Sequence, residues 1–282
     1  MTYCVAIDLD DGLVFASDSR TNAGVDQVST YSKMHTFEVE GQRMFVVLTA
    51  GNLATTQAVV HRLKRDMEDN AEESLATVER MSDAAEYLGR LNREETEKHS
   101  EALSRSGMQA EATMIIGGQI GEAPPGVYLI YPQGNYITTS QQTRFLQIGE
   151  SKYGKPILDR IIEHDTGLGD AARCALVSID STIRSNLTVG PPIEVLVYER
   201  GTLDFDHYLC MEADDEYLRS LTQAWDENIK RAFTDLPRFD WEGTHGRKQR
   251  GTRVSRGSSK TTGGSKAGTT KASTSKPKKP RR

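Results

Sequence analysis

The feature that most constrains the fold of this chain is the order of its hydrophobic patterns, in which runs of short strands alternate with pairs of helices. Residues Tyr3 to Leu9 carry their large apolar side chains at every second position, as a half-buried strand does. Asp10-Asp11-Gly12 is typical of a tight turn and leads into a second apolar run, Leu13 to Ala16. The sequence therefore predicts that the chain opens with a β-hairpin.

The same alternation of strand runs and helix pairs continues to residue 233. The expected elements are a strand over 43–49, helices over 53–67 and from about 78, a meander of strands at 111–117, 126–131, 136–138 and 145–148, helices over 153–161 and 168–183, a hairpin of 193–198 with 203–207, and a helix over 214–233. Strands grouped in runs favour antiparallel sheets covered by helices over a parallel βαβ fold. We expect an α+β protein.

The formal net charge of −5 combines two unlike segments. Residues 246–282 contain 13 Lys and Arg and no Asp or Glu, whereas the residues before them carry 22 basic against 40 acidic side chains. The basic segment has too few apolar residues to offset the entropy of ordering it. We expect one domain over residues 1–242 and a disordered tail over 243–282. The tail would either be solvated without a partner or bind polyanions weakly, with no preference for a nucleotide sequence.

No segment of the chain predicts a membrane span or a secretory leader. The longest apolar runs, such as Met44 to Leu48, are far shorter than the roughly 18 residues that a spanning helix needs. The first residues reach Asp8 before an apolar leader segment can form, and no positive charge precedes them. We expect a cytoplasmic protein.

Cysteine and histidine spacing predicts neither a disulfide framework nor a metal site. Cys4, Cys174 and Cys210 are odd in number and widely separated, and are expected to be small buried residues. The six histidines show no spacing typical of metal ligands. No metal or other cofactor is expected.

The first residues of the chain are the candidates for a catalytic nucleophile. Removal of Met1 would expose Thr2, because aminopeptidases that remove the initiator act when the second residue is small. The threonine hydroxyl is a weak nucleophile that needs a base, and an α-amine with a pKa of about 7.7–8.0 can serve as one.

Two charged residues lie where the predicted hairpin can bring them to the chain start. Asp18 ends the second strand of the hairpin, and Lys33 follows fifteen residues later. A lysine beside the threonine oxygen would favour its deprotonation, while the carboxylate would hold the ammonium in place. The alternative is an ordinary ion pair on the surface.

Several motifs carry a resemblance to a known family. They are Thr2 to Ala6, Ala16 to Gly24, Ser32 to Met34, Leu48 to Gly51 before a helix, Ile115 to Gly118 and Ile148 to Gly154. On these residues the chain resembles the proteasome-type N-terminal nucleophile hydrolases across roughly Thr2 to Glu199, and within them most resembles the bacterial ancestral β-subunit (Anbu) homologues. The resemblance implies a four-layer αββα sandwich of antiparallel sheets.

The same resemblance implies roles for five residues. Thr2 would be the nucleophile with its own amine as proton acceptor, Asp18 and Lys33 the supporting charges, and the Gly51 N–H the oxyanion donor. Ser151 would be a helper, although the family's Gly-Ser-Gly is here Gly149-Glu150-Ser151, so that Glu150 is a second candidate. Gly51 could equally be a simple turn between a strand and a helix.

The implied function is a threonine peptidase that acts inside a self-assembled ring or helix. Two departures keep alternatives open: the auxiliary aspartate is missing from Ser185 to Gly190, and Lys33 is one residue closer to Thr2 than in most family members. A non-proteolytic amidase or transferase on small peptides, or a catalytically weak assembly scaffold, fits these departures. The chain has no phosphate-binding Gly-x-x-x-x-Gly-Lys loop, so an ATPase or amide-ligase partner would be a separate protein.

Overall fold

The structure is a computed structural model that describes residues 1–22, 28–105, 107–205 and 207–244. It divides into a compact unit, Met1–Asp235, and a second unit, Leu236–Arg282, of which only residues up to 244 are described. The second unit contains the short helix η1, Asp240–Thr244. The tail predicted over 243–282 therefore lies outside the described residues from 245 onward.

The first sheet is built around the chain start. It is antiparallel and has the order β10-β1-β2-β11-β12, with β1 at Tyr3–Leu9, β2 at Gly12–Asp18, β10 at Phe145–Gly149, β11 at Ile193–Glu199 and β12 at His207–Met211. β1 and β2 form the predicted hairpin, in which Cys4 lies opposite Ser17. Because β10 covers the other edge of β1, the strand that follows Thr2 is held from both sides.

The second sheet, also antiparallel, has the order β5-β6-β7-β8-β9. Its strands are β5 at Met34–Val39, β6 at Arg43–Gly51, β7 at Ala112–Ile120, β8 at Gly126–Ile130 and β9 at Tyr136–Thr138, and a separate small ladder joins β3, Arg20–Asn22, to β4, Val28–Thr30. The meander was predicted to include the strand at 145–148, and this is wrong. That strand is β10, which crosses to the first sheet because its partner is β1.

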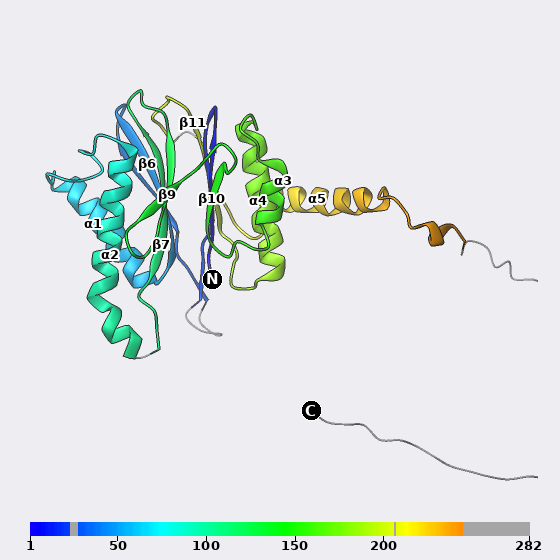
Figure 1. The fold of residues 1–282 in the computed structure, drawn as a ribbon, viewed down its shortest axis with the longest axis horizontal. Coiled ribbons are helices and arrows are strands. Elements are labelled where there is room, and N and C mark those ends of the chain that lie inside the picture. Colours follow the sequence, from blue (N-terminus) through cyan, green and yellow to red (C-terminus); the bar gives the residue numbers. More distant parts are fainter. Residues whose placement is uncertain (23–27, 106, 206, 245–282) are drawn as a thin grey trace, which may run out of the picture. The chain divides into compact units, whose positions relative to one another are not determined.

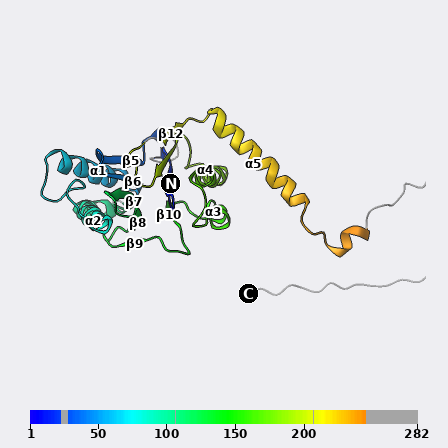
Figure 2. The same ribbon diagram turned by 90° about the horizontal axis from the view of Figure 1, so that it is seen from above.

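Helices cover the outer face of each sheet, as Figures 1 and 2 show. They are α1 at Leu53–Glu68 and α2 at Met81–Arg105 on the second sheet, and α3 at Lys155–Ile161 and α4 at Leu168–Ser185 on the first. A further helix, α5 at Glu216–Thr234, contacts α4 and extends away from the sheets. One apolar core lies between α1, α2 and the second sheet, another between the two sheets, and a third between the first sheet and α3 and α4. The predicted αββα sandwich is confirmed.

Strand β1 is buried on both faces, which fixes the position of the chain start. Tyr3, Val5 and Ile7 pack toward the helices, whereas Cys4 and Ala6 pack between the sheets. Each residue of such a strand is anchored by side-chain packing as well as by two hydrogen-bonded neighbours. Thr2, the residue before this strand, therefore leaves a rigid element.

Two details of the sequence analysis are corrected. The second strand of the last hairpin begins at His207 instead of Leu203, because Gly201 and Leu203 both have positive φ and widen the turn. Cys4 and Cys174 are buried as expected, but Cys210 is exposed on β12. Among the described residues no helix is both long and apolar enough to cross a membrane.

Candidate active site

A buried ion pair lies beneath the chain start. The ammonium Nζ of Lys33 is 2.6 Å from Oδ1 of Asp18, whose side chain has no exposed surface. The Asp18 carboxylate also accepts the backbone N–H of Tyr3 at 2.9 Å and that of Gly190 at 3.1 Å. Burial raises the pKa of Asp18, and these three donors oppose that rise. The pair is thus part of the interior, not of the surface.

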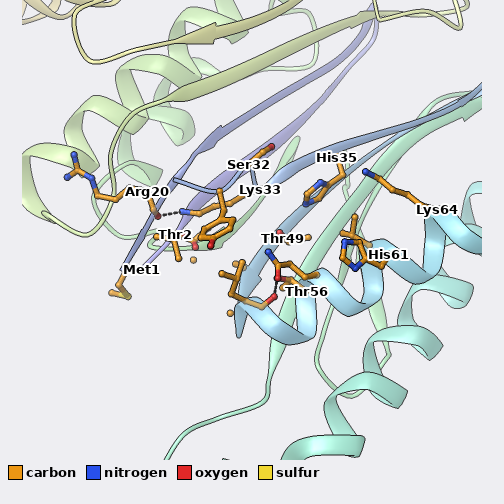
Figure 3. A pocket seen from close by; sticks show the side chains of 18 residues that line it. Met1, Thr2, Arg20, Ser32, Lys33, His35, Thr49, Thr56, His61 and Lys64 are labelled. Carbon is orange, nitrogen blue, oxygen red and sulfur yellow. Dashed lines mark hydrogen bonds between the residues drawn. The ribbon is translucent and has the colours of Figure 1, made fainter. Parts of the chain in front are cut away.

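A second hydrogen bond fixes the position of the Lys33 ammonium. Nζ also donates to the carbonyl of Arg20 at 2.7 Å, so two acceptors from one chain segment hold the ammonium. The Lys33 side chain lines the same cavity as Thr2, and Figure 3 shows both. The structure therefore brings Thr2, Asp18 and Lys33 together, as the sequence analysis expects.

The backbone of Thr2 is clamped by the turn after β10. Its carbonyl accepts the N–H of Glu150 at 2.7 Å. Gly149 has a φ of +83°, and a Cβ there would lie 2.0 Å from the Thr2 carbonyl oxygen, so that only glycine fits. In this structure Met1 precedes Thr2, and the Thr2 nitrogen is therefore in a peptide bond.

The pKa of the Met1 amine shows which charges act on the chain start. Burial and the nearby ammonium of Lys33 lower its pKa, while the carboxylates of Asp18 and Glu150 act in the opposite direction. The chain start thus lies within the field of one cation and two anions. An amine in such surroundings is more easily kept unprotonated than one in water.

Gly51 ends β6 at the edge of the cavity. Its φ is +116°, and a Cβ would come within 2.4 Å of the Glu111 carbonyl oxygen. The chain then turns into α1, whose N-cap Asn52 accepts the N–H groups of Ala54 and Thr55 at 3.0 and 3.2 Å. Gly51 is therefore required by the turn and is also placed on the cavity, next to the positive end of a helix dipole.

The cavity itself has a volume of about 510 Å³, a size typical of ligand sites. Thr2 and Lys33 lie at one end of it, and His35 of β5 with His61 and Lys64 of α1 at the other, as Figure 3 shows. Gly51 also lines it. Ser151 does not line it. No described group of three or more His, Cys, Asp or Glu side chains is arranged to hold a metal.

The region where the family aspartate is missing contains a hydrogen-bonded pair. Asn186 donates from Nδ2 to the buried Glu150 carboxylate at 3.1 Å, and its own Oδ1 accepts the hydroxyl of Thr188 at 2.6 Å. Glu150 is 5% exposed, so its carboxylate is held in place beneath the chain start. The Glu150 carboxylate therefore lies within the electrostatic reach of the Met1 amine.

Comparisons with known proteins show the family of the chain. Residues 2–198 match the family model described as "Proteasome subunit". Solved structures of Anbu, the ancestral β-subunit, are similar over most of the chain. The protein from Yersinia bercovieri is 44% identical with a TM-score of 0.80, covering 84% of this chain and 98% of its own. The helical Anbu assembly from Pseudomonas aeruginosa is 46% identical with a TM-score of 0.80, covering 84% and 98%.

The chain belongs to the proteasome subunit family, and within it to the Anbu group. A third Anbu structure, a Gly-1 mutant from Hyphomicrobium sp. strain MC1, is 44% identical with a TM-score of 0.79 and covers 85% of this chain and all of its own. No curated protein sequence matches.

The structure of this Anbu-group chain also contains a residue that the sequence analysis missed. The Glu194 carboxylate on β11 is 4% exposed and accepts the hydroxyls of Ser19 and Ser32, at 3.1 and 2.9 Å, and that of Tyr208 at 2.6 Å. Ser19 and Ser32 are the chain neighbours of Asp18 and Lys33. Glu194 therefore supports both backbone segments that carry the ion pair. The only sign of this role in the sequence is a single acidic residue within the apolar run 193–198.

Proposed function

We propose that this protein is an N-terminal threonine amide hydrolase that becomes active when Met1 is removed. One observation carries the proposal: Thr2, Lys33 and Gly51 line one cavity, above a fully buried carboxylate that fixes the lysine. A nucleophile, a cation and a backbone donor around one space are the parts that acyl transfer requires.

The reaction then follows from the roles of these groups. The Thr2 hydroxyl adds to the carbonyl carbon of a peptide bond while its proton passes to the liberated Thr2 amine. The Gly51 N–H stabilises the oxyanion, and the positive charge of Lys33 lowers the cost of the alkoxide. The C–N bond breaks with the proton returned to the leaving amine, and water hydrolyses the Thr2 ester, releasing the acid.

Glu150 takes the place of the missing aspartate in this proposal. Its carboxylate acts to raise the pKa of the Met1 amine, and we expect the same influence on the Thr2 amine that takes its place. The Asn186 side chain and the hydrogen bond from the Glu150 N–H to the Thr2 carbonyl hold Glu150 in place. A carboxylate near the amine keeps its pKa from falling too far through burial and Lys33, so that it can still accept a proton. Ser151 is left without a direct role, because its side chain does not reach the cavity.

Self-assembly is the second part of the proposal. The related protein from Pseudomonas aeruginosa is described as a helical assembly, and this chain matches it over 98% of its length. We infer that this protein is likewise a homo-oligomer, ring or helix, that works on peptide or protein substrates in the cytoplasm. An unfolding ATPase would be a separate chain.

Two measurements test the catalytic proposal. Mass spectrometry of the purified protein should find Thr2 at the N-terminus, and a peptide epoxyketone, which needs a hydroxyl and an amine on the same residue, should add to it. The variant Thr2→Ala should lose the adduct and keep its oligomeric state, because a small half-exposed side chain contributes little packing. A retained Met1, or an adduct that survives Thr2→Ala, would contradict the proposal. Labelling without cleavage of any peptide would point to an amidase of another substrate class.

A further inference from the structure

The cavity differs in charge from the domain around it. The chain before the basic tail has 40 acidic and 22 basic residues. The described residues that line the cavity nevertheless include Arg20, Lys33, Lys64, His35 and His61 and no Asp or Glu. A basic hollow in an acidic protein concentrates anions and repels cations.

The nearest carboxylates keep their charge, and Glu194 acts on His35, but none of them lines the cavity. Asp18 is taken by Lys33, Glu150 by Asn186, and Glu194 by three hydroxyl groups. All three side chains are nine-tenths or more buried and lie behind the lining. Their hydrogen-bonding capacity is already used by the protein.

The end of the cavity away from Thr2 is formed by three basic side chains from two elements. His35 comes from β5, while His61 and Lys64 lie one turn apart on α1 and point toward it (Figure 3). Within the described residues none of the three side chains has a hydrogen bond or an ion pair. Burial lowers the pKa of His35 to about 4, and the charges of Lys64 and His61 act in the same direction, with Glu194 opposing them.

Lys64 supplies a positive charge and the imidazoles of His35 and His61 supply N–H donors, so that together they form an unfilled site for an anion. The wall between them and Thr2 contains Leu53 and the buried Val60, which suit the methylene groups of a short side chain. The N–H of Gly51 and the hydroxyl of Thr2 fix the scissile carbonyl at the other end. The substrate residue that contributes this carbonyl can therefore extend its side chain along the cavity toward Lys64.

We propose that this cavity selects peptides with an acidic residue, glutamate or aspartate, on the acyl side of the bond that Thr2 attacks. The side-chain carboxylate would accept from Lys64 and His61, with His35 as a third donor. This inference rests on the proposed function for the chemistry, but the recognition of the carboxylate itself does not depend on it.

Binding without chemistry gives the first test. The Thr2→Ala variant is titrated with two N-acetylated tetrapeptide amides that differ only in a final Glu or Gln, at pH 7 and low salt. We expect the Glu peptide to bind about tenfold more tightly, since a hydrogen bond between charged partners adds about that much. Added salt should reduce the difference. Equal affinity for the two peptides would overturn the inference.

Charge reversal on α1 gives the second test, with a matched control on the same helix. Lys64→Glu should invert the preference, so that a peptide ending in Lys binds better than one ending in Glu. Arg65→Glu changes the same charge at the neighbouring position, outside the cavity, and should leave the tenfold preference as it is. If both variants shifted the preference equally, the general field of the protein and not this site would be responsible.

The chemistry of the site is tested separately with electrophilic peptides. Epoxyketones ending in Ala, Leu, Lys or Glu are compared by their rate of adduct formation with mature wild-type protein. A reaction with the Ala reagent but no faster reaction with Glu would refute the acidic preference and leave the catalytic proposal standing. Absence of any adduct together with a tenfold Glu preference in binding would refute the catalytic proposal and keep the acidic site.

Discussion

The ammonium of Lys33 and the fully buried carboxylate of Asp18 meet at 2.6 Å beneath the cavity. Such a pair is costly to bury and is then difficult to break, because either partner alone would be an uncompensated charge. The three donors to Asp18 come from β1, from the loop before β11 and from the segment before β5. This carboxylate therefore ties together three parts of the chain that are far apart in sequence.

The first prediction concerns this carboxylate. Asp18→Asn should lower the free energy of unfolding by about 3–5 kcal/mol, because it leaves the Lys33 ammonium buried without a counter-ion. Urea unfolding measured by circular dichroism checks this. The double variant Asp18→Asn with Lys33→Met should recover part of the stability without recovering adduct formation. A loss below about 1 kcal/mol in the single variant would show that Lys33 can turn to solvent.

A second prediction concerns the turn at Gly51 and separates the effect of a steric clash from the effect of a positive φ. Gly51→Ala forces a Cβ to 2.4 Å from the Glu111 carbonyl at a φ of +116°, whereas Gly41→Ala meets nothing within 4 Å at a φ of +63°. The Gly41 variant should lose only about 1 kcal/mol of stability, the cost of a left-handed conformation. The Gly51 variant should lose clearly more in thermal unfolding. Similar melting temperatures for the two variants would mean that the turn at Gly51 relaxes easily.

The sequence was sufficient for the elements whose signal is local. The alternating apolar residues of Tyr3 to Leu9 and the turn residues after them predict β1 and β2, because a hairpin forms between two segments that are adjacent in the sequence. The strand at 145–148 was recognised as a strand but assigned to the wrong neighbours. Nothing within Phe145 to Ile148 says that it pairs with a strand 140 residues earlier, since that pairing is decided by the packing of the whole domain.

The same distinction holds for the site. Thr2, Asp18, Lys33 and Gly51 could be selected because their residue types and spacing match a known arrangement. Glu194 stands out in the sequence only as an acid within an apolar run, and His35 has no local signal, because their roles arise from non-local packing: β11 lies beside β2, and His35 of β5 lines the same cavity as α1. The stripe Leu53, Gln57, Val60 and Lys64 on α1 has helical spacing and was a usable signal, because it follows directly after Gly51.

The third prediction tests the carboxylate that replaces the missing aspartate. Glu150→Gln removes an anion that acts to raise the pKa of the Met1 amine, so the pKa of the Thr2 amine that takes its place should fall. Because the unprotonated amine is the base, the acid limb of the profile of adduct formation against pH should move to lower pH. Glu150→Asp, which keeps the charge, should restore most of the original profile. An unchanged acid limb in the Gln variant would assign Glu150 a purely structural role through Asn186.

The fourth prediction uses the neutral histidine of the cavity. His35 has a pKa lowered to about 4 in the folded protein, against about 6.5 in an unfolded chain. Above pH 6.5 neither state binds the proton, and as the pH falls from 6.5 to 4 only the unfolded state gains it, so that folding stability falls. Through this residue alone the loss is roughly 2–3 kcal/mol, at about 1.4 kcal/mol for each pKa unit. Urea unfolding at pH 7.0 and 4.5 should therefore give a smaller difference for His35→Gln than for the wild type. His99→Gln, at an exposed position on α2, should behave as the wild type does, and the same pH difference in all three proteins would place the protonated His35 in contact with water.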